Sequence, residues 1–533
     1  MKKEISLLGL LLTTGVAFGQ YAGDAFRYSE IQQTGTARFR SLGGNHAALG
    51  GDASTTFGNP AGLGFYNRSE FSISPSLSIT NTESNYLGNQ TPSVSKTNPN
   101  IGHFGLVLAG NSQNENRRWR RTALGVTYSR QVNLHNSFSY QGRNNNSSIA
   151  DAFAADATQQ GYSSAYLDSQ FNQSSREANF LTAAAYQLYL FNPTLRANPN
   201  DDGAPYSRYD VGYPNADFPT VRRDNAFDQR ETFTSSGAHN QWTFSYAGNY
   251  DDKLYIGASL GLTRLRYEYN TIYRENAVGG NIIGEINRNE DLSVTGSGIN
   301  FSLGAIWKAD DKLQLGASVT SPTFTSVRET FNQSLSTDII GVPRIENGNP
   351  VLFVPDDQNI SVLPNDFEYD LTSPLRAMAG ATYFLGEKKV GFLTATAEYV
   401  GYAGMRVRTN VYNSQDNLDF RNDVKAEVQN TYNNVVNFRA GAEFRFGLLR
   451  VRGGVAYNPN PYKQTFDALA RSDRDKLIYS AGLGVRNDRF FADLAGSFVN
   501  FKSAQQPYTV QNGPSALITN QQTNAMLTLG VLF

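Results

Sequence analysis

The sequence predicts an all-β protein: a transmembrane up-and-down antiparallel β-barrel of about 14 strands whose lumen is plugged by an N-terminal hatch. Three observations predict this fold: an export signal at the N-terminus, repeated short segments in which apolar and polar residues alternate, and connections that alternate between short and long. The composition agrees, since the 533 residues include 48 Gly, 29 Tyr and 33 Phe but are only 40% hydrophobic. That balance suits strands better than a helical core.

Residues 1–19 have the pattern of a signal peptide. A positively charged start is followed by an apolar run over residues 5–18, and the small residues Ala17 and Gly19 come just before Gln20. An apolar run of about 14 residues is shorter than the roughly 20 that a membrane-spanning helix needs. We therefore expect an exported protein that begins at Gln20.

The composition also limits the possible chemistry. With no Cys, the chain has no disulfide, no thiolate metal site and no Cys for lipid attachment. Its four His residues are scattered without metal-ligand spacing, so we expect no metal and no other cofactor. A net charge of -1 gives no general attraction to nucleic acid or acidic membranes.

Period-2 alternation is clearest over residues 435–446. One face of this segment carries the apolar residues Val436, Phe438, Ala440, Ala442, Phe444 and Phe446. The other face carries Asn437, Arg439, Gly441, Glu443 and Arg445. In a soluble sandwich the charged face would meet water and the apolar face a core, whereas in a transmembrane barrel they meet lumen and lipid. The alternation by itself leaves both architectures open.

The connections separate these two architectures. The alternation predicts fourteen strands, at 70–79, 102–109, 122–130, 241–249, 254–262, 299–307, 313–320, 376–384, 391–400, 435–446, 449–457, 477–485, 490–499 and 524–533. Short linkers at 110–121, 250–253, 308–312, 385–390, 447–448 and 486–489 alternate with longer ones at 80–101, 131–240, 263–298, 321–375, 401–434, 458–476 and 500–523. Outer-membrane barrels have an even number of strands, tight periplasmic turns and long outer loops. We therefore expect a barrel over 70–533 in the outer membrane, with both termini in the periplasm.

The largest linker, 131–240, is too long for a bare loop and should be partly helical. Ser174-Ser175-Arg176-Glu177 has the spacing of a capping box, and Leu181 and Leu188 follow at helical spacing. Such a helix would either pack over the barrel mouth or offer an apolar surface that first contacts a hydrophobic ligand.

Two features concern partners at the membrane. The last strand ends in Phe533, and a terminal aromatic residue resembles the signal read by the outer-membrane assembly machinery. Arg117-Arg118-Trp119-Arg120-Arg121 could bind nucleic acid, but it falls in a predicted periplasmic turn. Anchoring to lipid headgroups, with Trp119 at the interface, is the interpretation that we favour.

Residues 20–69 do not alternate like strands and are rich in small residues, which let backbone pack closely. About fifty residues ahead of the first strand are well placed to fold inside the lumen as a plug. The alternative is a periplasmic tail.

This segment resembles the hatch of the FadL family of outer-membrane transporters for long-chain fatty acids and other hydrophobic compounds. The resemblance rests on Gly50-Gly51-Asp52-Ala53-Ser54 and on Phe57-Gly58-Asn59-Pro60-Ala61-Gly62-Leu63, which is similar to the family signature ending in Asn-Pro-Ala. Nearly the whole mature chain is covered.

The resemblance implies passive transport of a hydrophobic small molecule that leaves through a gap in the barrel wall. It assigns hatch and gating roles to Asn59, Pro60, Ala61 and Gly62. The candidate ligand contacts are Phe57, Leu63, Leu181 and Leu188. The alternative function is a barrel of the same kind that binds a protein in secretion or surface attachment.

An enzyme is not expected. The segment from Gly257 to Gly261 matches the G-x-S-x-G pattern of hydrolases around Ser259, but that pattern requires a sharp strand-to-helix turn. Here it lies within an alternating strand, where Gly and Ser facing a lumen explain it better.

Overall fold

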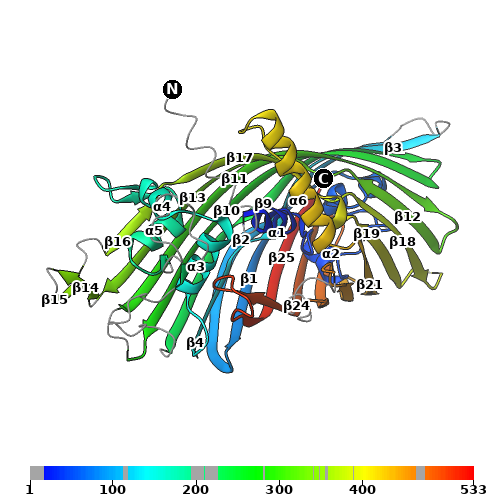
Figure 1. The fold of residues 1–533 in the computed structure, drawn as a ribbon. Coiled ribbons are helices and arrows are strands. Elements are labelled where there is room, and N and C mark those ends of the chain that lie inside the picture. The colour runs from blue at the N-terminus through cyan, green and yellow to red at the C-terminus, as the bar shows by residue number, and fades with distance from the viewer. Residues whose placement is uncertain are drawn as a thin grey trace.

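A closed barrel of fourteen antiparallel strands forms most of the part of the chain that the structure describes (Figure 1). The computed structural model describes residues 17–111, 118–193, 209–210, 226–279, 283–339, 341–346, 349–354, 358–387, 389–463 and 474–533. In order around the wall, the strands are β1 (Glu70–Tyr86), β2 (Asn89–Asn111), β3 (Trp119–Asn133), β9 (Phe227–Tyr250), β10 (Leu254–Ala277), β11 (Ile283–Lys308), β12 (Leu313–Thr320), β18 (Arg376–Leu385), β19 (Gly391–Val400), β21 (Val435–Phe446), β22 (Leu449–Asn458), β23 (Lys476–Arg486), β24 (Phe490–Gln505) and β25 (Ala516–Leu532). Each strand pairs with the next, and β1 pairs with β25 to close the wall.

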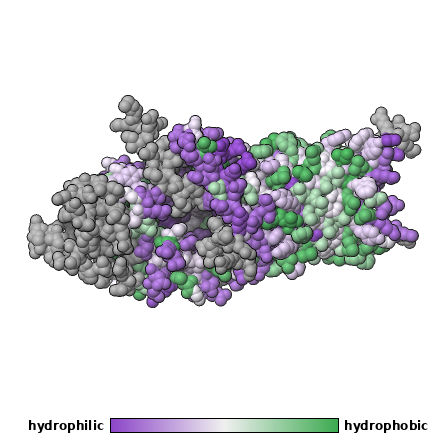
Figure 2. All heavy atoms as spheres, turned by 45° about the vertical axis from the view of Figure 1, so that its right-hand side comes forward, coloured by the Kyte–Doolittle hydropathy of each residue, from purple (hydrophilic) through white to green (hydrophobic). Residues whose placement is uncertain are grey.

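On the barrel strands, apolar side chains are exposed and polar side chains are buried, which is the reverse of the pattern in a soluble protein. On β21, Phe438 is 56% exposed and Phe446 is 64% exposed, whereas Asn437 and Glu443 are buried in the lumen. Figure 2 shows the hydrophobic residues gathered over one length of the barrel, between hydrophilic ends. Such a band suits the hydrocarbon of a bilayer and not water, so the soluble-sandwich reading of the alternation is wrong. Within the described residues, no helix combines the length and the apolar character needed to cross a membrane.

The predicted strands are confirmed, but several continue far beyond the predicted ends on the long-loop side. The expected linker 80–101 is mostly a continuation of β1 and β2, which turn tightly at Leu87 and Gly88, both with positive φ. The linker 263–298 likewise extends β10 and β11. Beyond the membrane both faces of a strand are free to carry polar residues, so the alternation that marks a strand is lost there.

Additional strands and helices lie on the long-loop side of the barrel. The longer strands are β4 (Asn136–Asn144), β13 (Phe324–Ile339), β16 (Asn359–Val362), β17 (Asn365–Thr372) and β20 (Arg406–Arg408). Short pairs are β5 (Phe171–Asn172) with β6 (Glu177–Ala178), β7 (Asn192–Pro193) with β8 (Tyr209–Asp210), and β14 (Val342–Glu346) with β15 (Asn349–Phe353). The helices are α3 (Ile149–Gln160), α4 (Ser164–Ser169), α5 (Leu181–Gln187), η3 (Tyr402–Gly404) and α6 (Ser414–Thr431).

The helices α3, α4 and α5 form a cap that shares an apolar core with β10, β11, β13 and β16, so the linker 131–240 is partly helical as expected. The capping box predicted at 174–177 is wrong. Asn172 accepts hydrogen bonds from the backbone N–H groups of Ser174 and Ser175, which makes this segment the turn between β5 and β6. The capping box is found instead at Ser148, where α3 begins.

The N-terminal segment folds inside the barrel. It contains α1 (Ala17–Ser29), α2 (Ala37–Ser41), η1 (Ala53–Phe57) and η2 (Pro60–Phe65), drawn in dark blue in Figure 1. Almost every residue from Ala37 to Leu63 is buried. The predicted signal peptide lies mostly outside the described residues, which begin at Ala17.

Candidate functional site

Asn59 ties the hatch to the barrel wall. Its side-chain amide donates to the carbonyl of Ala47 in the hatch at 2.6 Å. The same group also donates to the carbonyls of Ala305 on β11, at 3.1 Å, and Ala317 on β12, at 3.2 Å. Its side-chain oxygen caps η2 by accepting from the N–H of Ala61 at 3.1 Å. One fully buried amide therefore connects two strands of the wall to two segments of the hatch.

Glycines in the wall make room for this contact. A Cβ atom added at Gly304 would lie 2.0 Å from the side-chain oxygen of Asn59, and one at Gly316 would lie 1.9 Å from the carbonyl oxygen of Ala47. At Gly257 it would meet the backbone of Pro60 at 2.5 Å. Hatch backbone therefore packs directly against strand backbone, which only glycine permits at these positions.

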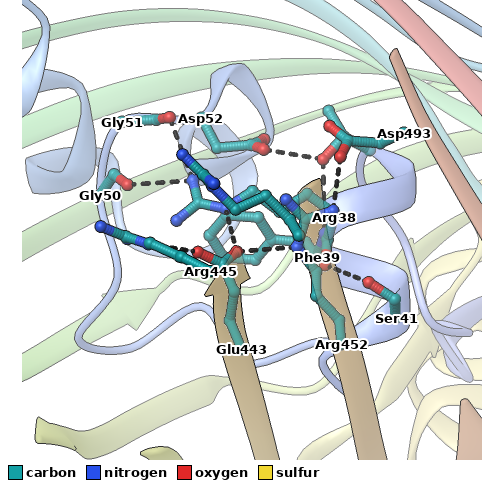
Figure 3. Close-up of polar contacts among 12 residues, drawn as sticks. Arg38, Phe39, Ser41, Gly50, Gly51, Asp52, Glu443, Arg445, Arg452 and Asp493 are labelled. Carbon is teal, nitrogen blue, oxygen red and sulfur yellow. Dashed lines mark hydrogen bonds and ion pairs between the residues drawn. The ribbon is translucent and has the colours of Figure 1, made fainter. Parts of the chain in front are cut away.

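A buried cluster of charges holds the opposite side of the hatch (Figure 3). Arg38 of α2 donates to the carbonyls of Gly50 and Gly51, at 3.3 and 3.1 Å, and lies 3.6 Å from Glu443 on β21. Glu443 also pairs with Arg452 of β22 at 2.7 Å. Because each charge in the cluster has opposite charges beside it, it can remain buried in the lumen.

A small cavity of about 70 Å³ lies in the lumen beside the hatch. Phe57 lines it, but most of its lining is polar and includes Gln33, Gln131, His239, Gln241 and Asn300. Hydrophobic residues are thus a minority in the space nearest to the hatch.

Two arginines and one glutamate also line this cavity. Arg376 lies 2.8 Å from Glu398, and Arg439 pairs with the other oxygen of the same carboxylate. Asn437 donates to Glu398 at 3.2 Å. The group carries one net positive charge, which favours an anion in the cavity.

On the long-loop side, α1 fills an aromatic chamber under α6. The ring of Tyr21 lies 5.2 Å from that of Phe367 on β17 and 5.3 Å from that of Phe420 on α6. Phe26 stacks on Tyr432 at 5.0 Å. Tyr21 and Phe26 fall within the hatch predicted over 20–69, but their packing role could not be predicted, because Phe367, Phe420 and Tyr432 are far away in the sequence.

The barrel wall is interrupted beside the lumen cavity. We call residues 321–323 and 373–375 the Ser-Pro break, since each segment contains the dipeptide Ser-Pro. Regular pairing holds up to Thr320 with Arg376 and resumes at Phe324 with Thr372. Across the break, the N–H of Thr323 binds the hydroxyl of Ser373 at 2.7 Å instead of a carbonyl. The N–H of Ser373 still donates to the carbonyl of Thr323 at 3.0 Å, whereas Pro322 and Pro374 have no N–H to add to the ladder.

The two sides of the Ser-Pro break open on different spaces. Ser321, Thr323, Ser373 and Pro374 line the lumen cavity. Pro322 lines a groove of about 950 Å³ on the outside of the wall, together with Leu262, Ile299, Phe324 and other residues of β10, β11, β13, β17 and β20. We call this space the outer groove. One layer of backbone, in which two prolines interrupt the regular pairing, separates it from the lumen.

The remaining predicted residues lie apart from the lumen cavity. Pro60, Ala61 and Gly62 are buried in η2, and Leu63 packs against the wall near Val107. Leu188 is fully buried in the core of the cap, and Leu181 packs against that core. Their roles as ligand contacts or gating residues stay predictions.

Two further predictions concern surface and strand residues. Phe533 is 64% exposed and exchanges backbone hydrogen bonds with Ser69, beside the end of the barrel. Trp119 begins β3 and is 49% exposed, whereas Arg117 lies outside the described residues. Ser259 is in the middle of β10, so the nucleophile elbow is absent from that segment.

Comparison with known proteins identifies the fold. No protein-family model and no curated protein sequence matches the chain. The structure is similar to that of a FadL homologue from Pseudomonas aeruginosa, with a TM-score of 0.52 and 12% identity, over 94% of this chain and 99% of that one. It is also similar to the toluene transporter TodX from Pseudomonas putida, with a TM-score of 0.50 and 12% identity, over 94% and 99% of the two chains. The chain therefore has the FadL fold, a fourteen-strand barrel of the type found in outer-membrane channels.

Proposed function

We propose that this protein carries hydrophobic small molecules, such as long-chain fatty acids, across the outer membrane by passive diffusion and catalyses no reaction. In the proposed orientation the short turns and both termini face the periplasm, and the cap formed by α3, α4 and α5 faces outward. The fold and the lipid-facing apolar band support a place in the outer membrane.

The observation that carries the proposal is the Ser-Pro break between the lumen cavity and the outer groove. A hydrophobic molecule that leaves the lumen sideways passes into lipid without crossing water, which is the favourable route for an apolar surface. The two prolines leave fewer backbone hydrogen bonds to separate when the wall opens. Movement down a gradient then needs only transient motion of the hatch and the wall.

A fatty acid suits the lumen better than a pure hydrocarbon. The net positive charge around Glu398, Arg376 and Arg439 favours a carboxylate, while the aromatic chamber that α1 now fills suits an apolar chain. The similar structure of TodX is named as that of a toluene transporter, and toluene is a smaller, uncharged aromatic molecule. An uptake assay should therefore offer both oleate and toluene.

A disulfide across the Ser-Pro break tests the lateral route. The chain has no Cys, so the double variant T323C/S373C introduces one possible bridge between two directly opposed residues. The control is T382C/T394C, a cross-strand pair whose hydroxyls lie 2.9 Å apart on β18 and β19, away from the break.

Uptake of labelled oleate is measured in cells that lack the native chain and carry either variant. We expect oxidation to abolish uptake through T323C/S373C, reduction to restore it, and the control to conduct in both states. Unchanged uptake through the fully oxidised T323C/S373C variant would rule out the lateral route.

A further inference from the structure

We propose that the outer groove binds an anionic lipid through its phosphate-bearing head group. The site consists of the exposed arginines Arg406 and Arg408, the hydroxyls of Ser297 and Ser326, and an apolar floor. It is distinct from the lumen, and its existence does not depend on the transported molecule.

Cross-strand register shows how the groove is arranged. One row of partners around the outer wall consists of Trp242, Leu262, Ile299, Phe324, Thr372 and Arg406. The next row toward the long loops consists of Asn240, Arg264, Ser297, Ser326, Asp370 and Arg408. The first row thus contains the last apolar residues of the membrane band, and the second begins the polar region. The groove crosses this boundary, where lipid head groups meet acyl chains.

The hollow has a simple cause. Ser297 and Ser326 stand in adjacent strands in the middle of the second row, between the longer side chains of Arg264 and Arg408. Below them, Leu262, Ile299 and Phe324 are 44%, 36% and 53% exposed. Small hydroxyl residues above an apolar floor therefore leave a space of about 950 Å³ open to the bilayer.

The charges at the rim favour an anion. Two other exposed arginines on this outer wall are engaged in ion pairs: Arg266 lies 2.8 Å from Glu268, and Arg328 lies 2.5 Å from Glu368. Among the described residues, no carboxylate lies within ion-pair distance of Arg406 or Arg408, although Asp370 is the cross-strand partner of Arg408. Both arginines are exposed and line the groove. Two neighbouring arginines with hydroxyls beside them are a common arrangement for binding phosphate, since each guanidinium group can donate two parallel hydrogen bonds.

The occupant is a lipid and not a free anion, because head-group and chain contacts are joined in one space. A phosphate between Arg406 and Arg408 would place its acyl chain along Leu262, Ile299 and Phe324. The bound lipid would lie over Pro322, on the outer side of the Ser-Pro break.

Fluorescence quenching tests the site directly. Trp242 is the cross-strand neighbour of Leu262, and substitution of Trp119 and Trp307 by Phe leaves it as the single Trp among the three in the chain. The variant with Trp242 as its single Trp is placed in phosphatidylcholine vesicles that contain a small fraction of phosphatidic acid with brominated acyl chains. The comparison uses brominated phosphatidylcholine at the same fraction.

We expect stronger quenching by the brominated phosphatidic acid, and the double change R406Q/R408Q should weaken this preference about tenfold or more. The control R328Q removes an exposed arginine that is already paired, and should keep the preference. Equal quenching by the two lipids would overturn the proposal. An equal loss of the preference in R328Q would also overturn it, because the preference would then come from general surface charge. Full competition by inorganic phosphate would also overturn the proposal, because the acyl chain of the lipid would then add nothing to the affinity.

Discussion

Replacing Asn59 with Ala should release the hatch from the wall. The change removes the cap of η2, which is worth about 1 kcal/mol, and the contacts to Ala305 and Ala317 on the wall, worth about 1 kcal/mol each. Because the cap lies within the hatch, only the two wall contacts, about 2 kcal/mol together, distinguish the docked hatch from a displaced one. Their loss corresponds to a roughly 30-fold increase in the population of the displaced hatch. The loss is local because the β11 and β12 ladder does not depend on this side chain.

Conductance in planar bilayers measures this population. We expect N59A to show frequent open events at a voltage where the wild-type protein stays closed. The control N422A changes an exposed Asn on α6 and should behave like the wild type. Folded N59A protein that stays as closed as the control would refute the reasoning that Asn59 holds the hatch.

Three further changes test other parts of the account. G316V places a side chain against the carbonyl of Ala47, so overpacking of about 1–3 kcal/mol should displace the hatch and make it accessible to protease added to purified protein; equal protection would contradict the close packing. F26A should loosen α1 by about 3 kcal/mol and speed hydrogen exchange in that helix, and unchanged exchange would mean that the aromatic chamber does not hold it. Burial raises the pKa of Glu427 on α6 to about 7 from 4.5, so the stability that this carboxyl contributes is lost as pH rises from about 4.5 through 7. In denaturant unfolding, E427Q should therefore be more stable than the wild type by about 1 kcal/mol at pH about 8 and equally stable at pH about 4. A stability difference that does not change with pH would exclude this cause.

The barrel could be predicted from sequence because lipid imposes a regular pattern. Each membrane-spanning segment must turn apolar residues outward, so segments such as 435–446 carry the alternation in full. Outside the membrane this requirement ends, and β13 and β17 were predicted only as a loop between 321 and 375. The two Ser-Pro dipeptides at Pro322 and Pro374 are visible in the sequence, but only the strand register shows that they lie opposite each other in the wall.

The hatch was predicted in place but not in its contacts. The Asn59-Pro60 motif marks it, whereas the long-range partners of Asn59 on β11 and β12 lie about 250 residues away and depend on tertiary packing. Arg38 and Glu443 are joined for the same reason. The filling of the aromatic chamber by α1 has no local signal, since Tyr21 and Phe26 follow directly on an apolar export signal.

The measurement that tests the central claim most directly is uptake of labelled oleate by cells lacking this chain, compared with the same cells carrying it again. We predict slow uptake in the deletion strain and recovery on complementation, with toluene entry affected in the same direction and uptake of a small sugar unchanged. Equal oleate and toluene entry in the two strains, with the protein present at normal levels in the outer membrane, would contradict a role in transport of hydrophobic molecules.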